Sequence, residues 1–370
     1  MIKAVYIHIP FCEHICSYCD FCKMFYYSSF VDQYLEALEK EIKEKYEKEE
    51  IETLYIGGGT PSCLSYEQLK KLFSILKIFH RSSKLEFTVE CNIENIDKQK
   101  LELFYQEGVN RLSIGMQTFH PHHLKTLQRN HTKKDAQSVI SLAKKLRFQN
   151  INVDLMYALP GETLEEVMED VSFILSLNVP HVSTYSLMIE PHTKLFQQNQ
   201  KPIDEDLDAQ MYEKICEILT HHGYEHYEIS NFSKPGFCSK HNLTYWNNEP
   251  YYGFGLGASG YIKNIRYENT KSFQKYIRGS FLFNEETMDD LTELQNTFLL
   301  GFRKIKGISK KEFYQKYSFD LHEINKIRIG LEKGYLEENK EYIYIKKQYI
   351  YESNEILLEF LDIERSKKNE

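Results

Sequence analysis

Short runs rich in Val, Ile and Tyr alternate with longer segments of helical period up to about residue 227. The pattern predicts strands, each followed by a helix, at residues 5–9, 53–56, 85–90, 111–114, 150–155 and 181–186. Repeated strand–helix units imply parallel strands joined by right-handed crossovers, hence an α/β fold. Periodicity does not decide between a flat doubly wound sheet and a partial (β/α)6 barrel.

Helix start and stop signals support these units. The pairs Ser65/Gln68 and Thr163/Glu166 have the spacing of capping boxes, and Gly108 is placed to end a third helix. Unusual residues follow the strands at their carboxyl ends, where a barrel collects its working groups, and this favours the partial barrel.

The pattern changes near residue 284. Residues 291–302 and 320–334 have helical period, and residues 341–351 predict a two-stranded ribbon. We therefore expect three regions: a barrel at 1–230, a connector at 231–283 and a small winged-helix-like domain at 284–370. Because this last region lacks a conspicuous basic helix, we expect it to be a lid or docking element.

Composition narrows the functional classes. A net charge of −8 argues against a protein that grips a phosphate backbone, so no nucleic-acid partner is expected. We find no apolar stretch long enough for a transmembrane segment and no signal peptide, so we expect a cytoplasmic protein. Thiols stay reduced there, and the eight cysteines are expected to be metal ligands and core residues instead of disulfides.

Four of these cysteines stand together in "HIPFCEHICSYCDFC". Cys12, Cys16 and Cys19 have the spacing C-x3-C-x2-C, which lets one short loop hold a cubic iron–sulfur cluster and leaves one iron open. Two alternatives remain from the residues alone. A zinc site could draw on these cysteines with Cys22, His8 or His14, and a closed electron-transfer cluster could use Cys22 as its fourth ligand.

With Tyr18 just before the last cysteine, "YIHIPFCEHICSYCDF" resembles the radical S-adenosylmethionine superfamily, in its coproporphyrinogen oxidase-like branch. The resemblance implies a 4Fe-4S cluster on Cys12, Cys16 and Cys19. It implies that S-adenosylmethionine binds the open iron, that Tyr18 lies against the adenine, and that the reduced cluster generates a 5'-deoxyadenosyl radical. The implied fold is the partial barrel.

Further positions match the same family. The segment "YIGGGTPSCL" resembles the family's GGGTP segment, whose backbone meets the methionyl amine, and glycine there permits close approach of the ligand. The resemblance implies that Glu90 binds the ribose hydroxyls. It also implies that Gln117, Arg129 and Asp154 occupy positions that contact a second S-adenosylmethionine in the oxidases. The predicted cofactor contacts in this part of the chain are Tyr6, Tyr18, Gly58, Gly59, Thr60, Glu90, Gln117, Arg129 and Asp154.

Two functions compete within this branch. One is an enzyme, oxygen-independent coproporphyrinogen III dehydrogenase, and the other is a haem chaperone, so the sequence leaves open whether the protein is an enzyme. The oxidases carry a fourth cysteine two positions after the third, where this chain has Phe21, and Cys22 lies one place further. We also expect this chain to lack the N-terminal extension of the oxidases.

The segment "SKHNLTYW" favours the chaperone, because His241, Asn242, Tyr245 and Trp246 match its HNxxYW motif. A neutral imidazole ligates haem iron well, and aromatic side chains offer flat apolar surface. The resemblance therefore predicts haem at His241, Tyr245 and Trp246 in the connector. On the residues alone, a loop anchored by its aromatics is favoured instead.

The chaperone reading implies further partners. It predicts a haem-acceptor protein and leaves open a membrane-associated acceptor, a peripheral position at the membrane and a homodimer. Three residues depart from the family pattern: Ile93 stands for a proline, Ala158 stands for a glycine, and Cys22 is an additional cysteine.

Overall fold

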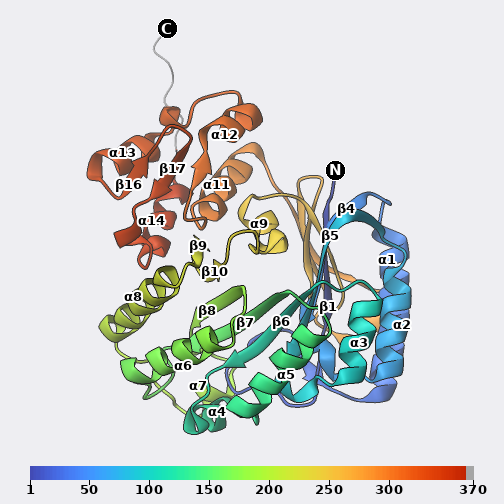
Figure 1. Cartoon of the computed structure of the whole chain (residues 1–370). Coiled ribbons are helices and arrows are strands. Elements are labelled where there is room, and N and C mark those ends of the chain that lie inside the picture. The colour runs from blue at the N-terminus through green and yellow to red at the C-terminus, as the bar shows by residue number, and fades with distance from the viewer. Residues whose placement is uncertain (364–370) are drawn as a thin grey trace.

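The computed structural model describes residues 1–363, and its centre is a curved sheet of parallel strands (Figure 1). All six predicted strands are confirmed, and they lie side by side in chain order and run parallel. They are β1 (Ala4–Ile9), β4 (Glu50–Gly58), β5 (His80–Asn92), β6 (Arg111–Gln117), β7 (Asn150–Tyr157) and β8 (His181–Ser186).

Helices follow these strands and cover the outer face of the sheet (Figure 1). Both predicted capping boxes form, with Ser65 and Gln68 at the start of α2 and Thr163 and Glu166 at the start of α6. Gly108 has a φ of +89° just after α3, as expected of a helix-ending glycine. The covering helices are α1 (Ser28–Lys45), α2 (Tyr66–Leu76), α3 (Lys98–Gln106), α5 (Lys133–Lys145), α6 (Leu164–Ser176) and α8 (Glu205–His221).

The parallel strands form a partial barrel because other strands occupy both edges. The β8 edge pairs with antiparallel β10 (Asn231–Ser233), which pairs with β9 (Glu225–Glu228). The β1 edge pairs with parallel β11 (Tyr251–Phe254). The sheet then continues through antiparallel β12 (Ser259–Ile262), β13 (Ile265–Asn269) and β14 (Leu282–Thr287), so that it has twelve strands in all.

A buried carboxylate joins this second edge to the barrel. Glu41 on α1 is fully buried and accepts hydrogen bonds from the Gly255 backbone N–H at 2.9 Å and from Asn269 Nδ2, Tyr276 OH and Lys45 Nζ at 2.7 Å each. Four donors therefore satisfy one carboxylate, as a buried charge requires. The bonds fix the turn after β11 and the helix α10 (Phe273–Ile277) against α1.

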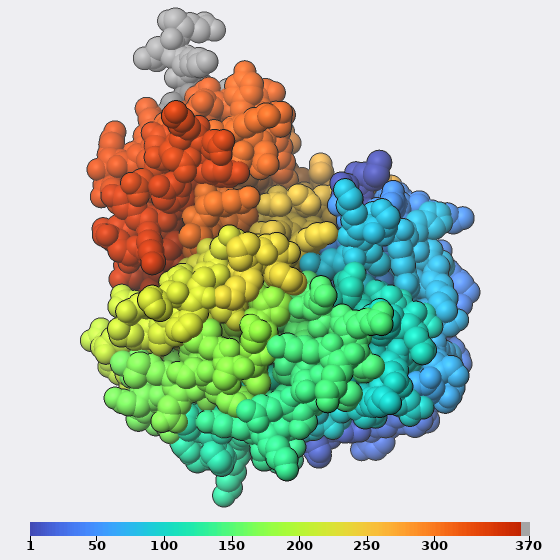
Figure 2. Space-filling view, in the orientation of Figure 1, coloured from blue at the N-terminus to red at the C-terminus, as the bar shows by residue number. Residues whose placement is uncertain are grey.

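The C-terminal residues gather in one lobe, orange to red in Figure 2, that rests on the yellow segment around α9 (Lys240–Trp246). This lobe combines helices with a small antiparallel sheet, as the sequence predicts. Its elements are α11 (Asp290–Gly301), β15 (Ile308–Ser309), α12 (Lys310–Tyr317), α13 (Asn325–Lys333), β16 (Leu336–Glu338), β17 (Tyr342–Ile345) and α14 (Ser353–Leu358).

The prediction that residues 341–351 form a two-stranded ribbon by themselves is wrong. Only β17 comes from this range, and it lies between β16 and β15, while Lys347–Tyr349 forms a 3-10 turn. The side chain of Asn339 accepts hydrogen bonds from the backbone of Glu341 and Tyr342, so the hairpin turn lies before β17. Exposed glutamates in β16 conceal its strand character in the sequence.

Two other predictions concern the whole chain. In residues 1–363, no helix is both long enough and apolar enough to cross a membrane. The domain boundaries at residues 230/231 and 283/284 stay predictions, although β10 to β14 belong to the same sheet as the barrel strands.

We predict that Glu41→Gln lowers the free energy of unfolding by about 1–3 kcal/mol, because the new amide group cannot accept the bonds that one carboxylate oxygen accepts. Urea unfolding at neutral pH measures this change. Glu36→Gln on the same helix is the matched control, because its carboxylate makes only an exposed pair with Lys71 and should change stability by less than about 0.5 kcal/mol. Equal effects of the two substitutions would contradict the role of Glu41.

Candidate functional site

The cysteine loop begins directly after β1. Two short strands, β2 (Phe11–Cys12) and β3 (Met24–Phe25), pair in parallel and close the loop at its base. The loop therefore has fixed ends, and it lies at the carboxyl end of the barrel strands, above the glycine run that ends β4. Cys12 Sγ lies 3.6 Å from Thr60 Oγ1, and Cys16 Sγ lies 4.0 Å from Arg129 Nη1.

Three of the four clustered cysteines face one cavity of about 370 Å³, which Cys12, Cys16 and Cys19 line. Cys22 lies elsewhere, because its Sγ packs against the backbone of Gly257, where a Cβ would approach it to 2.8 Å. The structure therefore brings together the three cysteines of the C-x3-C-x2-C motif and separates Cys22 from them.

His8, a candidate ligand of the alternative zinc site, has both of its ring nitrogens in hydrogen bonds in this structure. His8 is buried, its Nε2 lies 2.7 Å from the Cys22 carbonyl oxygen, and its Nδ1 lies 3.1 Å from Tyr6 OH. Burial lowers the pKa of His8 to about 4, so the ring is neutral, but both nitrogens are occupied. Burial also raises the pKa of Cys12 to about 11, so a metal must displace the thiol proton when it binds.

The glycine run forms one wall of the same cavity. Gly58 has a φ of +112°, which favours glycine, and a Cβ on Gly59 would lie 2.8 Å from the Phe11 carbonyl oxygen and 3.0 Å from Cys12 Sγ. Gly58, Gly59 and Thr60 all line the cavity. Glycine is therefore needed here because the backbone passes close to the cysteine loop.

Glu90 lies near the end of β5, the strand next to the glycine run, and lines the same cavity. Its Oε1 accepts a hydrogen bond from Tyr55 OH at 2.7 Å, and its Oε2 accepts one from the Gly58 backbone N–H at 3.0 Å. Burial raises the pKa of Glu90 to about 7, although both of these bonds oppose the rise. The carboxyl group therefore changes its charge near neutral pH.

Three more predicted residues complete the walls: Gln117, Arg129 and Asp154. Gln117 has a φ of +69°, and its Oε1 is buried without a hydrogen-bond partner among the described residues. Arg129 is held in place by Asn92 Oδ1 at 2.9 Å and by the Gly115 carbonyl oxygen at 2.8 Å. An unpaired buried acceptor and a strained backbone at one position are typical of a ligand site.

Tyr18 lines the cavity between the second and third cysteines. Its ring packs against a small apolar cluster that is separate from the main core and consists of Leu127, Met156, Leu159, Leu187 and Leu195. A flat aromatic ring on an apolar base suits a stacked heterocycle.

The remaining predicted residues lie away from this cavity. His241 on α9 is 1% exposed, with Nδ1 2.8 Å from Thr53 Oγ1 and Nε2 2.8 Å from Tyr245 OH. Thr53 belongs to the first half of β4, so α9 covers the end of the barrel opposite to the cysteine loop (Figure 1). The ring of Tyr6 lies 6.4 Å from that of His241, on the inner side of the barrel.

In this structure His241 has no free ring nitrogen. Burial lowers its pKa to about 3, so the imidazole is neutral, yet both nitrogens are in hydrogen bonds. Trp246 lies at the end of α9 with the Arg303 guanidinium 5.5 Å above its ring, so it joins the barrel to the C-terminal lobe. The prediction that His241 ligates haem iron stays a prediction, and it requires at least one of these bonds to open.

Two departures from the family pattern have visible effects. Ala158 has a φ of +60°, a left-handed conformation that costs a non-glycine residue about 1–2 kcal/mol, which explains the usual glycine. Ile93 begins a 3-10 turn directly after β5 and is buried. Its backbone thus makes the turn without proline.

Sequence reasoning missed several wall residues. Ser113, Met156 and Tyr185 lie on the strands, and Met188 and Glu190 lie on the segment after β8. Nothing in their spacing marks them, because their shared position depends on how neighbouring strands align. The periodicity of β6 to β8 was the only available signal, since it indicates which residues face inward.

The cavity residues fit the cofactors that the motif implies. Three thiols converge, the glycine backbone is bare, Gln117 offers an unpaired acceptor, and Glu90 offers a carboxylate near an aromatic seat at Tyr18. These groups could hold a 4Fe-4S cluster on Cys12, Cys16 and Cys19 with S-adenosylmethionine beside it.

The fold and this cavity define a radical S-adenosylmethionine domain, and the sequence profile of the Radical SAM superfamily matches residues 6–174. Proteins named haem chaperone HemW match almost the whole chain. The one from Bacillus subtilis (strain 168) is 41% identical over 97% of this chain and 99% of its own length. The one from Lactococcus lactis subsp. lactis (strain IL1403) is 41% identical over 92% and 89%. The chain belongs to the HemW family.

More distant proteins agree with this assignment. HemW from Escherichia coli (strain K12) is 30% identical over 97% of this chain and 98% of its own length. The solved structure of coproporphyrinogen III oxidase HemN from Escherichia coli has a TM-score of 0.85 at 20% identity, over 97% of this chain and 90% of that one. That second likeness shows the fold alone, and the predicted partial barrel is thereby confirmed.

We predict that serine at Cys12, Cys16 or Cys19 abolishes incorporation of a four-iron cluster, whereas Cys22→Ser leaves it intact, because only the first three thiols face the cavity. Iron and sulfide analysis after anaerobic reconstitution, with electron paramagnetic resonance of the reduced protein, measures the outcome. Cys63→Ser serves as a buried-thiol control. A cluster that survives Cys19→Ser but not Cys22→Ser would refute this ligand set.

Proposed function

We propose that the protein is a haem chaperone, which binds haem and delivers it to an acceptor protein. The strongest support is that relatives named HemW match nearly the full length, including residues 239–246, which lie outside the radical SAM profile. We also propose that the cluster and S-adenosylmethionine bind in the cavity at the mouth of the barrel and that their binding governs haem transfer. When bound, the cluster and S-adenosylmethionine would supply radical chemistry at this site.

The chain's own residues would prepare this cavity in four ways. The backbone of Gly58 and Gly59 lines the cavity and would meet the methionyl part, and Tyr18 supplies a flat apolar surface for the adenine. Glu90, once ionised, can accept hydrogen bonds from a ribose hydroxyl pair. Gln117 has a spare acceptor for a ligand donor.

Haem binding at His241 would need one of its two hydrogen bonds to open. The bond to Tyr245 is the one to release, because both residues lie on α9 and a rotation of the Tyr245 side chain breaks it without moving α9 from Thr53 on β4. A net cost of about 0.5–1.5 kcal/mol for that bond would be small beside a coordination bond. Burial already keeps the imidazole neutral, which is the form that ligates iron.

A second cavity offers another place for haem. It has about 830 Å³ beside the cysteine loop, and its walls combine apolar Phe25, Phe119 and Leu124 with His14 and Lys125. Apolar walls suit a porphyrin ring, and a cation suits its carboxylates. Haem that binds here would not depend on His241.

The acceptor would dock at the mouth of the barrel. Phe21, Tyr185 and Met188 line the mouth and are 64%, 42% and 73% exposed. Exposed apolar side chains gathered in one place are typical of interaction surfaces. We propose that the protein is cytoplasmic and that its acceptor is membrane-associated. The homodimer that the resemblance leaves open would also form through an exposed apolar surface of this kind.

The alternative function is oxygen-independent coproporphyrinogen III dehydrogenase. In this chain the position of their fourth cysteine is taken by Phe21, whose side chain is 64% exposed, and this favours the chaperone. The fold does not separate the two, because it is common to both.

We predict that the cluster-loaded protein binds one haem per chain without converting coproporphyrinogen III. If His241 ligates the iron, His241→Ala should weaken haem binding at least tenfold, whereas Tyr245→Phe should not, because it frees the Nε2 atom. Haem titration followed by the Soret band measures affinity, and anaerobic incubation with coproporphyrinogen III measures turnover. Turnover would overturn the chaperone proposal, and unchanged binding in His241→Ala would place haem elsewhere.

We also predict that S-adenosylmethionine binds about tenfold more tightly at pH 8 than at pH 6, because ionised Glu90 accepts ribose hydrogen bonds and its pKa is about 7. The raised pKa means that the carboxyl group is protonated below pH 7 and ionised above it. Equilibrium dialysis on the cluster-loaded protein measures the affinity. In Glu90→Gln the pH dependence should disappear, and a dependence that persists there would assign it to another group.

A further inference from the structure

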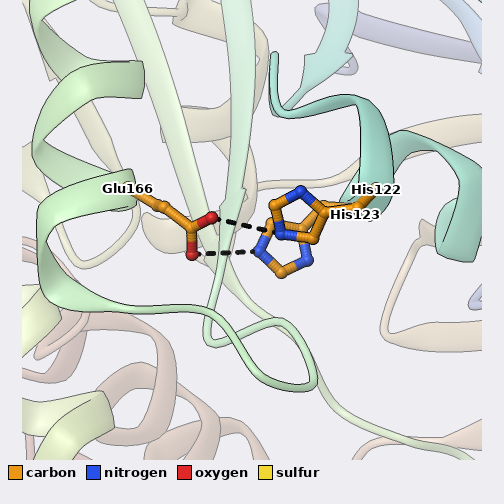
Figure 3. Close-up of side chains that lie close together, drawn as sticks. All are labelled: His122, His123 and Glu166. Carbon is orange, nitrogen blue, oxygen red and sulfur yellow. Dashed lines mark hydrogen bonds and ion pairs between the residues drawn. The ribbon is translucent and has the colours of Figure 1, made fainter.

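Two neighbouring histidines on α4 (Pro121–Leu127) face one carboxylate on α6 (Figure 3). His122 Nε2 lies 3.1 Å from Glu166 Oε1, and His123 Nε2 lies 3.3 Å from Glu166 Oε2. The three side chains lie outside the cysteine cavity and have no part in the proposed haem function.

The convergence of these two rings is unusual for their positions. Successive residues on an α-helix point about 100° apart. Here the two ring centroids are only 4.0 Å apart, and both rings turn a nitrogen toward the same carboxylate. Such an arrangement brings three donor atoms within 4.8 Å of one another.

The separations match those around a metal ion. A tetrahedral zinc ion with nitrogen and oxygen ligands at 2.0–2.1 Å holds its ligand atoms about 3.3 Å apart. The two nitrogen–oxygen separations, 3.1 and 3.3 Å, run to the two different oxygens of Glu166 and are close to that edge length. The three groups are therefore near enough to one another to share one ion.

A plain ion pair is the simpler explanation of each contact taken alone. It does not require both rings to turn a nitrogen toward the same carboxylate, whereas a shared cation does. The carboxylates of Glu169 and Asp170 lie beside the neighbouring His120, 3.8 and 3.7 Å from its Nε2.

We propose that His122, His123 and Glu166 bind a divalent transition-metal cation, with water in the remaining position. The ligand set of two imidazoles and one carboxylate suits zinc, among other first-row metals. The side chain of His122 is 61% exposed and so gives the ion an entry path, while that of His123 is 2% exposed and anchors it.

Metal binding would also stabilise the cysteine loop. Ser17 in that loop is fully buried, and it donates hydrogen bonds to the carbonyl oxygens of Thr126 and Leu127 on α4. An ion held by α4 and α6 would cross-link the two helices and so fix the support of this loop. Occupancy of the site should therefore raise the melting temperature of the protein.

The test measures zinc binding to the tag-free, cluster-loaded protein by anaerobic equilibrium dialysis. We expect one zinc per chain without loss of iron, and at least tenfold weaker binding in His122→Ala and in Glu166→Gln. Glutamine can still serve as the N3 residue of a capping box, so Glu166→Gln preserves the start of α6. Circular dichroism checks the fold of each variant.

The chain offers a matched control in His221, which is also adjacent to a second histidine, His222, with ring centroids 5.5 Å apart. His221→Ala should leave zinc binding unchanged. X-ray absorption at the zinc edge should show nitrogen and oxygen ligands at 2.0–2.1 Å, and zinc should raise the melting temperature of the wild type but not of Glu166→Gln. Sulfur at 2.3 Å, equal binding in all variants, or no zinc bound at 1 mM would each overturn the proposal.

Discussion

Parallel alignment of the barrel strands is the constraint from which the site follows. Each crossover returns the chain to the same end of the sheet, so every strand ends on one rim. The cysteine loop after β1, the glycines at the end of β4, Glu90 near the end of β5 and Gln117 at the end of β6 are far apart in sequence, yet they meet there. An antiparallel arrangement would send alternate strand ends to opposite rims.

Burial at that rim destabilises the ionised forms of its side chains, and we expect the bound cofactors to offset this cost. The Cys12 thiol and the Glu90 carboxyl both hold their protons more tightly than in water, because the apolar surroundings disfavour charge. Gln117 keeps an unpaired acceptor in a left-handed backbone. Several energetically unfavourable features thus occur together at this rim, which is typical of a ligand-binding site.

Much of this could be read from the sequence, but not all of it. The strand periodicity identifies the parallel strands, and the cysteine spacing identifies the three cavity thiols, because both are local patterns. The barrel itself was indicated by the unusual residues at the strand ends and by the family resemblance. The position of His241 could not be predicted, because its bonds to Thr53 and Tyr245 depend on how α9 seats against β4. The strand β16 was missed for a related reason, since its pairing with β17 outweighs its exposed glutamates.

The anchoring of Ser17 has a consequence for how the iron–sulfur group is held. This residue is bonded to α4 through its N–H and hydroxyl, and its carbonyl oxygen accepts a bond from the Leu195 backbone on α7 (Lys194–Gln197). The loop would therefore lose little conformational freedom when the iron–sulfur cluster binds, because folding has already restricted it. The same loop as a free peptide would lose that freedom on binding, so the folded chain should retain the iron–sulfur cluster far longer than the peptide would.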